Sequence, residues 1–430
     1  MIMRTIPVIL TCCWYLVLIQ PVRAQTEGSL TLETCYTLAE QNYPLTKQRE
    51  LIRQSREYSV DNVLKGYLPQ FTVNGQASYQ SDVTQLPIKV PGTDVHVLSK
   101  DQYKLYAEVS QVVYDGGVIR QQQHAQEVNA QVEEQKLEVE LYKLRERINQ
   151  LYFGILLTDE QLLQNELLKK DIQIGITKTQ AAIDNGTAFK SKADALKAEL
   201  LKASQRTTEL QAMRTAYLDV LGMFLNQPLP AQTTLARPAI LIPSEEIHRP
   251  ELKLYDFQNT TLDVQRELLS AKNRPRLSLF LQGGYGRPAL NMLSNSFEAY
   301  YIGGARLSWT LSGWYTIKKE KAILNNSSRS IQAQRETFLF NTNASSRQQH
   351  AEIVKLQQLL QSDDAIIALR ESVKTAAAAQ LDNGVIDTND YLREVNAEDQ
   401  SRQTKILHEI QLLLAQYNQQ TITGHESAHP

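Results

Sequence analysis

The sequence contains an internal repeat of two copies, and each copy contains a very long stretch without proline. No proline lies between Pro91 and Pro228, and none lies between Pro288 and Pro430. Because proline breaks helix interiors, each stretch can hold helices far longer than those of an ordinary globular domain. The proline at position 44 has its counterpart at position 250 (250 − 44 = 206), so the two copies can be aligned. This internal repeat is the first constraint on the fold.

The first residues have the pattern of a secretory signal. Residues 1–24 combine a positively charged start, a short apolar core and a small residue, Ala24, at the expected cleavage site. Cys12 and Cys13 lie within this segment, so the mature chain keeps only Cys35 and can form no internal disulfide. The net charge of −2 argues against a nucleic-acid partner, which needs a basic patch.

The repeat divides the rest of the chain into four parts. Residues 25–227 form the first structural repeat, with a helix, a strand pair and a long helical hairpin. A proline-rich connector, residues 228–250, leads to the second structural repeat, residues 251–422. Residues 423–430 are expected to be a flexible tail.

Each repeat contains two segments in which apolar and polar residues alternate. They lie at residues 71–79 and from about 103 in the first copy, and at 276–285 and 301–309 in the second. A period of two predicts strands with one apolar and one polar face. One interpretation is a small soluble four-stranded sheet packed on helices, and the other is strands that face lipid on one side and a polar lumen on the other.

Four strands cannot close a membrane barrel alone, because an open edge in lipid leaves backbone groups unpaired at several kcal/mol each. The membrane interpretation therefore requires several chains to share one barrel. Aromatic residues at the segment ends favour this interpretation, because they fit two interfacial girdles. These aromatic residues are Tyr79, Tyr103, Tyr114, Tyr285, Tyr300, Tyr301, Trp309 and Trp314.

Helices are predicted on both sides of each strand pair. The first spans residues 30–65, and long helices follow the strand-to-helix turns, where Asp115 and Ser312 are suitable N-caps. These turns comprise Asp115, Gly116, Gly117, Ser312 and Gly313. After the first turn, apolar residues recur at spacings of three and four, which indicates a seam that needs a partner helix. The seam consists of Leu137, Leu141, Leu144, Ile148, Leu151 and Ile155.

Both long helices end at the same tripeptide, Asp-Asn-Gly, at residues 184–186 and 382–384. Glycine after a helix takes the left-handed conformation that closes its C-terminus, so both tripeptides are expected to be helix ends.

Catalytic chemistry is poorly represented. The seven histidines are scattered, and Gly283-Gly284-Tyr285-Gly286 follows a strand but opens no helix, as a phosphate-binding loop would. We therefore predict no enzyme, no catalytic residue, no cofactor and no metal site.

Four kinds of short motif occur along the chain: Tyr67-Leu68-Pro69, Val113-Tyr114-Asp115-Gly116-Gly117, Arg249-Pro250-Glu251-Leu252 and the two Asn-Gly turns. In order and spacing, these motifs resemble those of TolC-family outer-membrane efflux proteins over essentially the whole mature chain. The resemblance implies a mainly helical fold with a small β part, in which the duplicated long helices of a homotrimer form a coiled-coil α-barrel. Each of the three chains would contribute four strands to one shared 12-stranded β-barrel.

The resemblance also implies a location and partners. The β-barrel would lie in the lipid of the Gram-negative outer membrane and the helices in the periplasm. The chain would be the passive exit duct of a tripartite efflux or type I secretion system. Its partners would be a periplasmic adaptor (membrane fusion) protein and an inner-membrane pump of the RND or ABC type.

Site residues follow from the resemblance position by position. The adaptor would dock around the glycine turns, which are Asn185, Gly186, Thr187, Asn383, Gly384 and Val385. Candidates for the gate at the periplasmic mouth are Lys192, Asp194, Asp387, Asp390 and Arg393, with Lys192–Asp390 and Arg393–Asp194 as candidate links. Lys192 stands where a carboxylate is common in the family, which is a departure in the charge pattern of the gate.

Three other functions remain open at this point. A porin-like trimeric diffusion channel would need more strands per chain and less helix than the proline-free stretches imply. A periplasmic coiled-coil adaptor would usually have a single hairpin flanked by β-rich domains. A soluble coiled-coil scaffold would need neither a secretory signal nor strand pairs.

Overall fold

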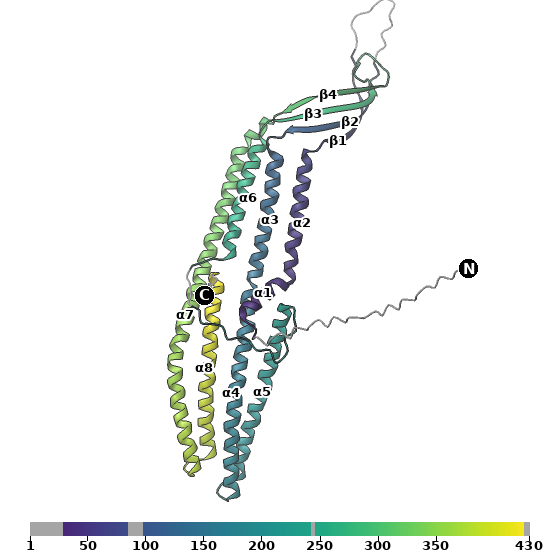
Figure 1. The fold of residues 1–430 in the computed structure, drawn as a ribbon. Helices are drawn as coiled ribbons and strands as arrows, with labels where there is room; N and C mark the ends of the chain where they lie inside the picture. Colours follow the sequence, from purple (N-terminus) through teal and green to yellow (C-terminus); the bar gives the residue numbers. More distant parts are fainter. Residues whose placement is uncertain (1–28, 85–97, 242–245, 425–430) are drawn as a thin grey trace, which may run out of the picture.

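The computed structural model describes residues 29–84, 98–241 and 246–424, so the predicted signal and residues 425–430 lie outside the described part. A four-stranded sheet lies at one end of an elongated molecule, and two helical hairpins end at the other (Figure 1). The helices are α1 (Leu32–Asn42), α2 (Lys47–Leu64), α3 (Val118–Tyr142), α4 (Leu144–Asp184), α5 (Lys190–Leu225), α6 (Pro250–Lys272), α7 (Ile317–Asp382) and α8 (Thr388–Thr423). The strands are β1 (Gln70–Tyr79), β2 (Asp101–Tyr114), β3 (Arg276–Arg287) and β4 (Glu298–Ser308).

The internal repeat is visible in the order of these elements. Each copy has helix, two strands and then a long helical hairpin, here called hairpin 1 (α4 and α5) and hairpin 2 (α7 and α8). This confirms the predicted class, a mainly helical fold with a small β part. In the described part of the chain, no helix has both the length and the apolar character needed to span a bilayer.

The sheet has the strand order β1-β2-β3-β4, and all neighbouring strands are antiparallel. Its register places most of the apolar residues of the four strands on one face, because Val73 pairs with Ala107, Ala107 with Gly283 and Gly283 with Tyr301. This face is open to the surroundings within one chain, as the 78% exposure of Tyr301 and the 72% exposure of Leu307 show. The outer edges of β1 and β4 have no partner strand within the described part of the chain.

The register corrects one aromatic assignment. Tyr300 pairs with Gly284 and lies on the polar face, so it does not belong to the apolar girdles with Tyr301. Adjacent residues of a strand point to opposite faces, and only one of two consecutive tyrosines can point toward the apolar side.

The first helical region is interrupted where the pattern of residues 30–65 predicted one helix. A 3-10 turn, Pro44–Thr46, separates α1 from α2, because Pro44 cannot donate the backbone hydrogen bond of a helix interior. Leu32, Cys35 and Ala39 lie on one face of α1 and are buried.

The long helices confirm the predicted seam, whose six residues are all buried. Helix α7 has 66 residues, or about 100 Å at 1.5 Å per residue. Its counterpart in the first repeat is divided at Lys143 into α3 and α4.

The largest apolar core lies midway along the rods, where hairpins 1 and 2 meet α1. Ile148 and Phe153 of α4 pack there with Leu218 of α5 and with Leu413 and Tyr417 of α8. Figure 1 shows α1 beside α4 at this level. The core therefore fixes the two hairpins to each other far from their turns.

Candidate functional site

The two hairpin turns have the same backbone geometry. Gly186 and Gly384 have φ angles of +72° and +69°. The N–H of Thr187 donates to Ala182 O at 2.8 Å, and the N–H of Val385 donates to Gln380 O at 2.8 Å. These are the six-to-one hydrogen bonds of a Schellman motif, so both Asp-Asn-Gly tripeptides end their helices as predicted.

A cleft of about 440 Å³ separates the two turns. Four of the predicted docking and gate residues line it: Thr187, Lys192, Asn383 and Gly384. On its wall, Lys178 of α4 and Asp382 of α7 form an ion pair of 2.8 Å that joins hairpin 1 to hairpin 2. Both turns lie at the end of the molecule opposite the sheet (Figure 1).

Two of the predicted gate residues, Asp390 and Arg393, pair with each other on α8 at 3.5 Å. Arg393 also contacts Glu394. Neither the Lys192–Asp390 nor the Arg393–Asp194 link forms within the described chain, where Arg393 has these closer partners. An exposed ion pair of this kind contributes about 0–1 kcal/mol, so the gate assignment stays a prediction.

Asp387 has a structural role at the start of α8. Its carboxylate accepts hydrogen bonds from the backbone N–H groups of Asn389 at 2.8 Å and Asp390 at 3.0 Å. The N–H of Asp390 is the main cause that lowers the pKa of Asp387, and the charges of Lys192 and Arg393 act in the same direction. Asp387 is therefore an N-cap whose carboxylate is also stabilised by the charges of Lys192 and Arg393, the two basic gate candidates.

At the other end of the rods, the two strand-to-helix turns differ. The Asp115 carboxylate accepts from the N–H groups of Gly117 at 2.8 Å and Ile119 at 2.6 Å, so it caps the start of α3, although Gly117 and not Asp115 occupies the N-cap position. Ser312 lies inside a 3-10 helix, Leu311–Tyr315, and α7 begins only at Ile317. The prediction that Ser312 caps the helix is therefore wrong.

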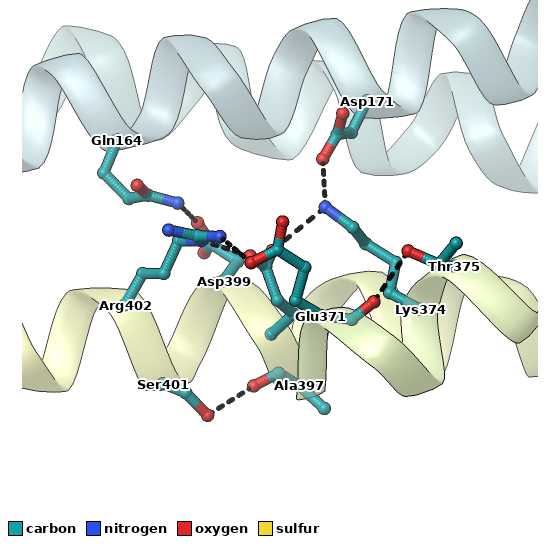
Figure 2. A network of polar contacts seen from close by, with 10 residues as sticks. Gln164, Asp171, Glu371, Lys374, Thr375, Ala397, Asp399, Ser401 and Arg402 are labelled. Atoms are coloured by element: carbon teal, nitrogen blue, oxygen red, sulfur yellow. Dashed lines mark hydrogen bonds and ion pairs between the residues drawn. The ribbon is translucent and has the colours of Figure 1, made fainter. Parts of the chain in front are cut away.

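A polar network with a buried centre joins the two hairpins, and Figure 2 shows its side chains. Lys374 of α7 donates to Asp171 of α4 at 2.9 Å and to Glu398 of α8 at 3.3 Å. Arg402 also pairs with Glu398 and reaches Glu371 at 3.1 Å. We call these side chains the interhairpin network, together with the amides and carboxylate described next: Gln164, Asp171, Glu371, Lys374, Glu398, Asp399, Arg402 and Gln403.

The basic groups of the network compensate an almost fully buried carboxylate. The side chain of Glu398 is 4% exposed, and an unpaired charge in such a place would be strongly destabilising. Burial opposes the charge on Lys374, but Asp171 and Glu398 outweigh it and raise the pKa of the ammonium. Lys374 is therefore charged at neutral pH.

Asp399 is the second buried carboxylate of the network. It accepts from Gln164 of α4 at 2.9 Å and from Gln403 at 3.0 Å. Burial raises the pKa of Asp399, and the two amide hydrogen bonds offset part of this effect. The α4–α8 contact thus contains an acid that binds a proton more readily than an exposed aspartate does.

The sequence analysis missed this network, although one signal pointed to it. Glu398 and Asp399 continue the three-and-four spacing of Tyr391, Leu392 and Val395, which are buried on α8. Acidic residues in register with a buried seam need polar partners, so the spacing could have identified Glu398 and Asp399 as members of a polar network. Their partners on α4 and α7 could not be identified from the spacing alone.

Comparisons with known proteins identify the fold. No protein-family model matches the chain, and no curated protein sequence matches it. Among solved structures, the outer-membrane channel OprN is similar with a TM-score of 0.67 at 16% identity, over 92% of this chain and 90% of that chain. The transmembrane channel CusC gives 0.68 at 13% identity, over 92% of each chain. The outer-membrane channel CmeC of Campylobacter jejuni gives 0.62 at 13% identity, over 95% and 92%. The chain thus has the fold of these channels over nearly its whole length.

Proposed function

We propose that the chain is one subunit of a trimeric outer-membrane exit duct that serves a tripartite efflux or type I secretion system. The observation that carries the proposal is the sheet, which has one exposed apolar face, one polar face and two free edges, and which continues directly into long helical rods. In a soluble domain the apolar face and the outer edges of such a sheet would be exposed to water, whereas a barrel shared between chains covers the face with lipid and pairs the edges.

Closure by three copies satisfies both needs of the sheet. Edge β4 of one chain would pair with edge β1 of the next, and three sheets of four strands would give twelve strands. The apolar face would contact the lipid of the Gram-negative outer membrane, and the polar face would line the bore. The likeness in fold to outer-membrane channels supports this arrangement.

The helical rods would form the periplasmic part of the duct. Their turns, Asn185-Gly186-Thr187 and Asn383-Gly384-Val385, and the cleft between them would receive a periplasmic adaptor protein, through which an inner-membrane pump of the RND or ABC type supplies the energy. The duct itself would be passive and would perform no chemistry on its cargo.

Two adjacent residues provide the test of the membrane assignment. Leu281 and Gln282 lie on opposite faces of β3. In proteoliposomes, a membrane-impermeant maleimide should label Gln282→Cys through the water-filled bore and leave Leu281→Cys unlabelled in lipid. Cys35 is buried and gives little background. Equal labelling of the two cysteines, or a monomeric protein after detergent extraction, would overturn the proposal.

A further inference from the structure

Two aromatic side chains on the polar face of the sheet, Phe280 and Tyr300, lie along the sheet instead of projecting from it. Both are half-buried. On the apolar face, by contrast, Tyr301 is 78% exposed. Side chains in strands normally stand roughly perpendicular to the sheet, so the polar face needs a local cause for this difference.

Glycines directly across the strands are that cause. Phe280 pairs with Gly304, where a Cβ atom would lie 3.3 Å from Phe280 Cε1 and 3.4 Å from Phe280 Cζ. A Cβ atom at Gly284 would lie 2.6 Å from Tyr106 Cβ and 2.8 Å from Tyr300 Cζ. The rings of Phe280 and Tyr300 therefore occupy the space that side chains at Gly304 and Gly284 would fill.

Polar contacts hold the same layer in place. The guanidinium of Arg306 lies 4.5 Å from the ring centroid of Phe280 and 3.2 Å from Glu108. The hydroxyl of Tyr300 accepts from Gln282 at 3.4 Å. Both contacts run along the wall, which keeps the long side chains flat.

We propose that Gly284 and Gly304 set the width of the bore, and hence the upper size of the cargo that leaves it. This rests on the proposed function, in which the polar face lines the bore. The Gly283-Gly284-Tyr285-Gly286 segment lies within β3 and forms no phosphate loop. It would then be part of the barrel wall, where the absence of a side chain at Gly284 leaves the bore wide.

The geometry makes this clearance matter. Twelve strands spaced by about 4.8 Å and tilted by about 40° form a cylinder of roughly 12 Å radius at the backbone. A ring lying flat takes about 3.5 Å of that radius. A ring pointing inward takes roughly twice as much, and three symmetry-related chains would each contribute one.

Substitution of neighbouring glycines on opposite faces tests the proposal. Gly304→Leu on the bore side should lift Phe280, whereas Gly303→Leu on the lipid side meets the Leu281 side chain and the Phe280 backbone but not the Phe280 ring, and serves as the matched control. Single-channel current in planar bilayers is measured while non-electrolyte polymers of graded size are added to the extracellular side alone. This measures the outer entrance separately from the periplasmic mouth.

The expected result is that the largest polymer admitted falls by at least one size step in Gly304→Leu and does not change in Gly303→Leu. The double variant Phe280→Ala/Gly304→Leu should regain the original size, because the lifted ring is gone. An unchanged size in Gly304→Leu, or a double variant as narrow as the single one, would overturn the proposal.

Two further outcomes are distinguishable. If Gly304→Leu does not assemble, Gly304→Ala replaces it, with a smaller fall expected and no fall counting against the proposal. If the unmodified protein forms no channel, both the proposed function and this inference are wrong. If the unmodified protein conducts and only the predicted change in polymer size is not seen, this inference is wrong and the proposed function stands.

Discussion

The interhairpin network gives the sharpest prediction about the periplasmic rods. We expect Lys374→Met to loosen the contact between hairpins 1 and 2, because methionine keeps much of the apolar stem but loses the ammonium that Asp171 and Glu398 share. Glu398 would then rely on Arg402 alone.

The magnitude follows from burial. Removing one partner of a buried ion pair costs about 3–5 kcal/mol. Two features lower this figure, because Arg402 remains beside Glu398 and the side chain of Asp171 is 35% exposed to water. We therefore expect a loss of about 2–3 kcal/mol in the local free energy of opening, which is a fall in amide protection of roughly 30- to 150-fold.

Hydrogen exchange read by mass spectrometry measures this loss on the segments of α4 and α8 that flank Asp171 and Glu398. The matched control is Lys355→Met on the same α7, because Lys355 forms a solvent-exposed pair with Glu352 at 2.6 Å. Pairs of that kind contribute about 0–1 kcal/mol. A second comparison is the double variant Lys374→Met/Glu398→Gln, whose cost should be about 1–3 kcal/mol less than the sum of the single costs.

Two results would refute the reasoning. One is exchange in Lys374→Met that rises no more than in Lys355→Met. The other is a double variant whose cost equals the sum of the two single variants, because the ammonium and the carboxylate would then be energetically independent.

Three further predictions concern the same rods. Burial raises the pKa of Asp399, so the ionised carboxylate lowers the stability of the fold at neutral pH, and this loss disappears as the pH falls toward 3.8, the ordinary pKa of an aspartate. Asp399→Asn should therefore unfold at a higher temperature than the unmodified protein at pH 7 and should lose this advantage by about pH 4. An equal difference in unfolding temperature at both pH values would contradict the assignment. Gly384→Ala meets open space but must keep a φ of +69°, so we expect a loss of about 1–2 kcal/mol in thermal or denaturant unfolding and a smaller loss for Gly384→Asn; equal losses would contradict a purely conformational cause. Asp390→Asn and Arg393→Gln should raise the closed-state current in planar bilayers if these residues hold the mouth closed, and an unchanged current in both would count against the gate.

The strands and the hairpin turns could be predicted because their signals are local. A period of two places Val73, Ala107 and Tyr301 on one face regardless of which strands are neighbours, and the register confirms it. A glycine after Asp-Asn predicts a left-handed residue from the adjacent backbone alone, and both turns have one.

Ser312 shows where local reasoning stops. Its type suits a helix cap, but Gly313 next to it lies against Asn273, the residue that follows α6, and leaves no room there for a Cβ atom. Trp309 also donates to the backbone carbonyl of Asn273 at 3.0 Å. These contacts accompany a 3-10 turn in place of a capped helix start, and they depend on the packing of two elements that sequence spacing does not reveal.

The interhairpin network was hidden for a similar reason. Asp171 and Lys374 are 203 residues apart, and the sequence of a long helix does not state which of its faces will meet another hairpin. The acidic residues on the α8 seam marked the need for partners, whereas the identity of those partners came only from the structure.

The contacts between the hairpins become smaller and more exposed along α4, and this gradient has a mechanical consequence. Near the middle of the molecule, Ile148 and Phe153 share a large close-packed apolar core with α8. Further down, a smaller apolar cluster joins Ile172 and Ile176 of α4 to Leu392 of α8, beside the polar contacts of Gln164 with Asp399 and of Asp171 with Lys374. At the turns, Lys178 meets Asp382 in an ion pair whose side chains are 44% and 49% exposed. Close-packed apolar side chains resist separation, while exposed ion pairs exchange readily with water and salt. Separation of the hairpins therefore costs least at the turns and most at the large core, so a duct built from these rods would open from the turns upward and bend where α4 meets α8 in that core.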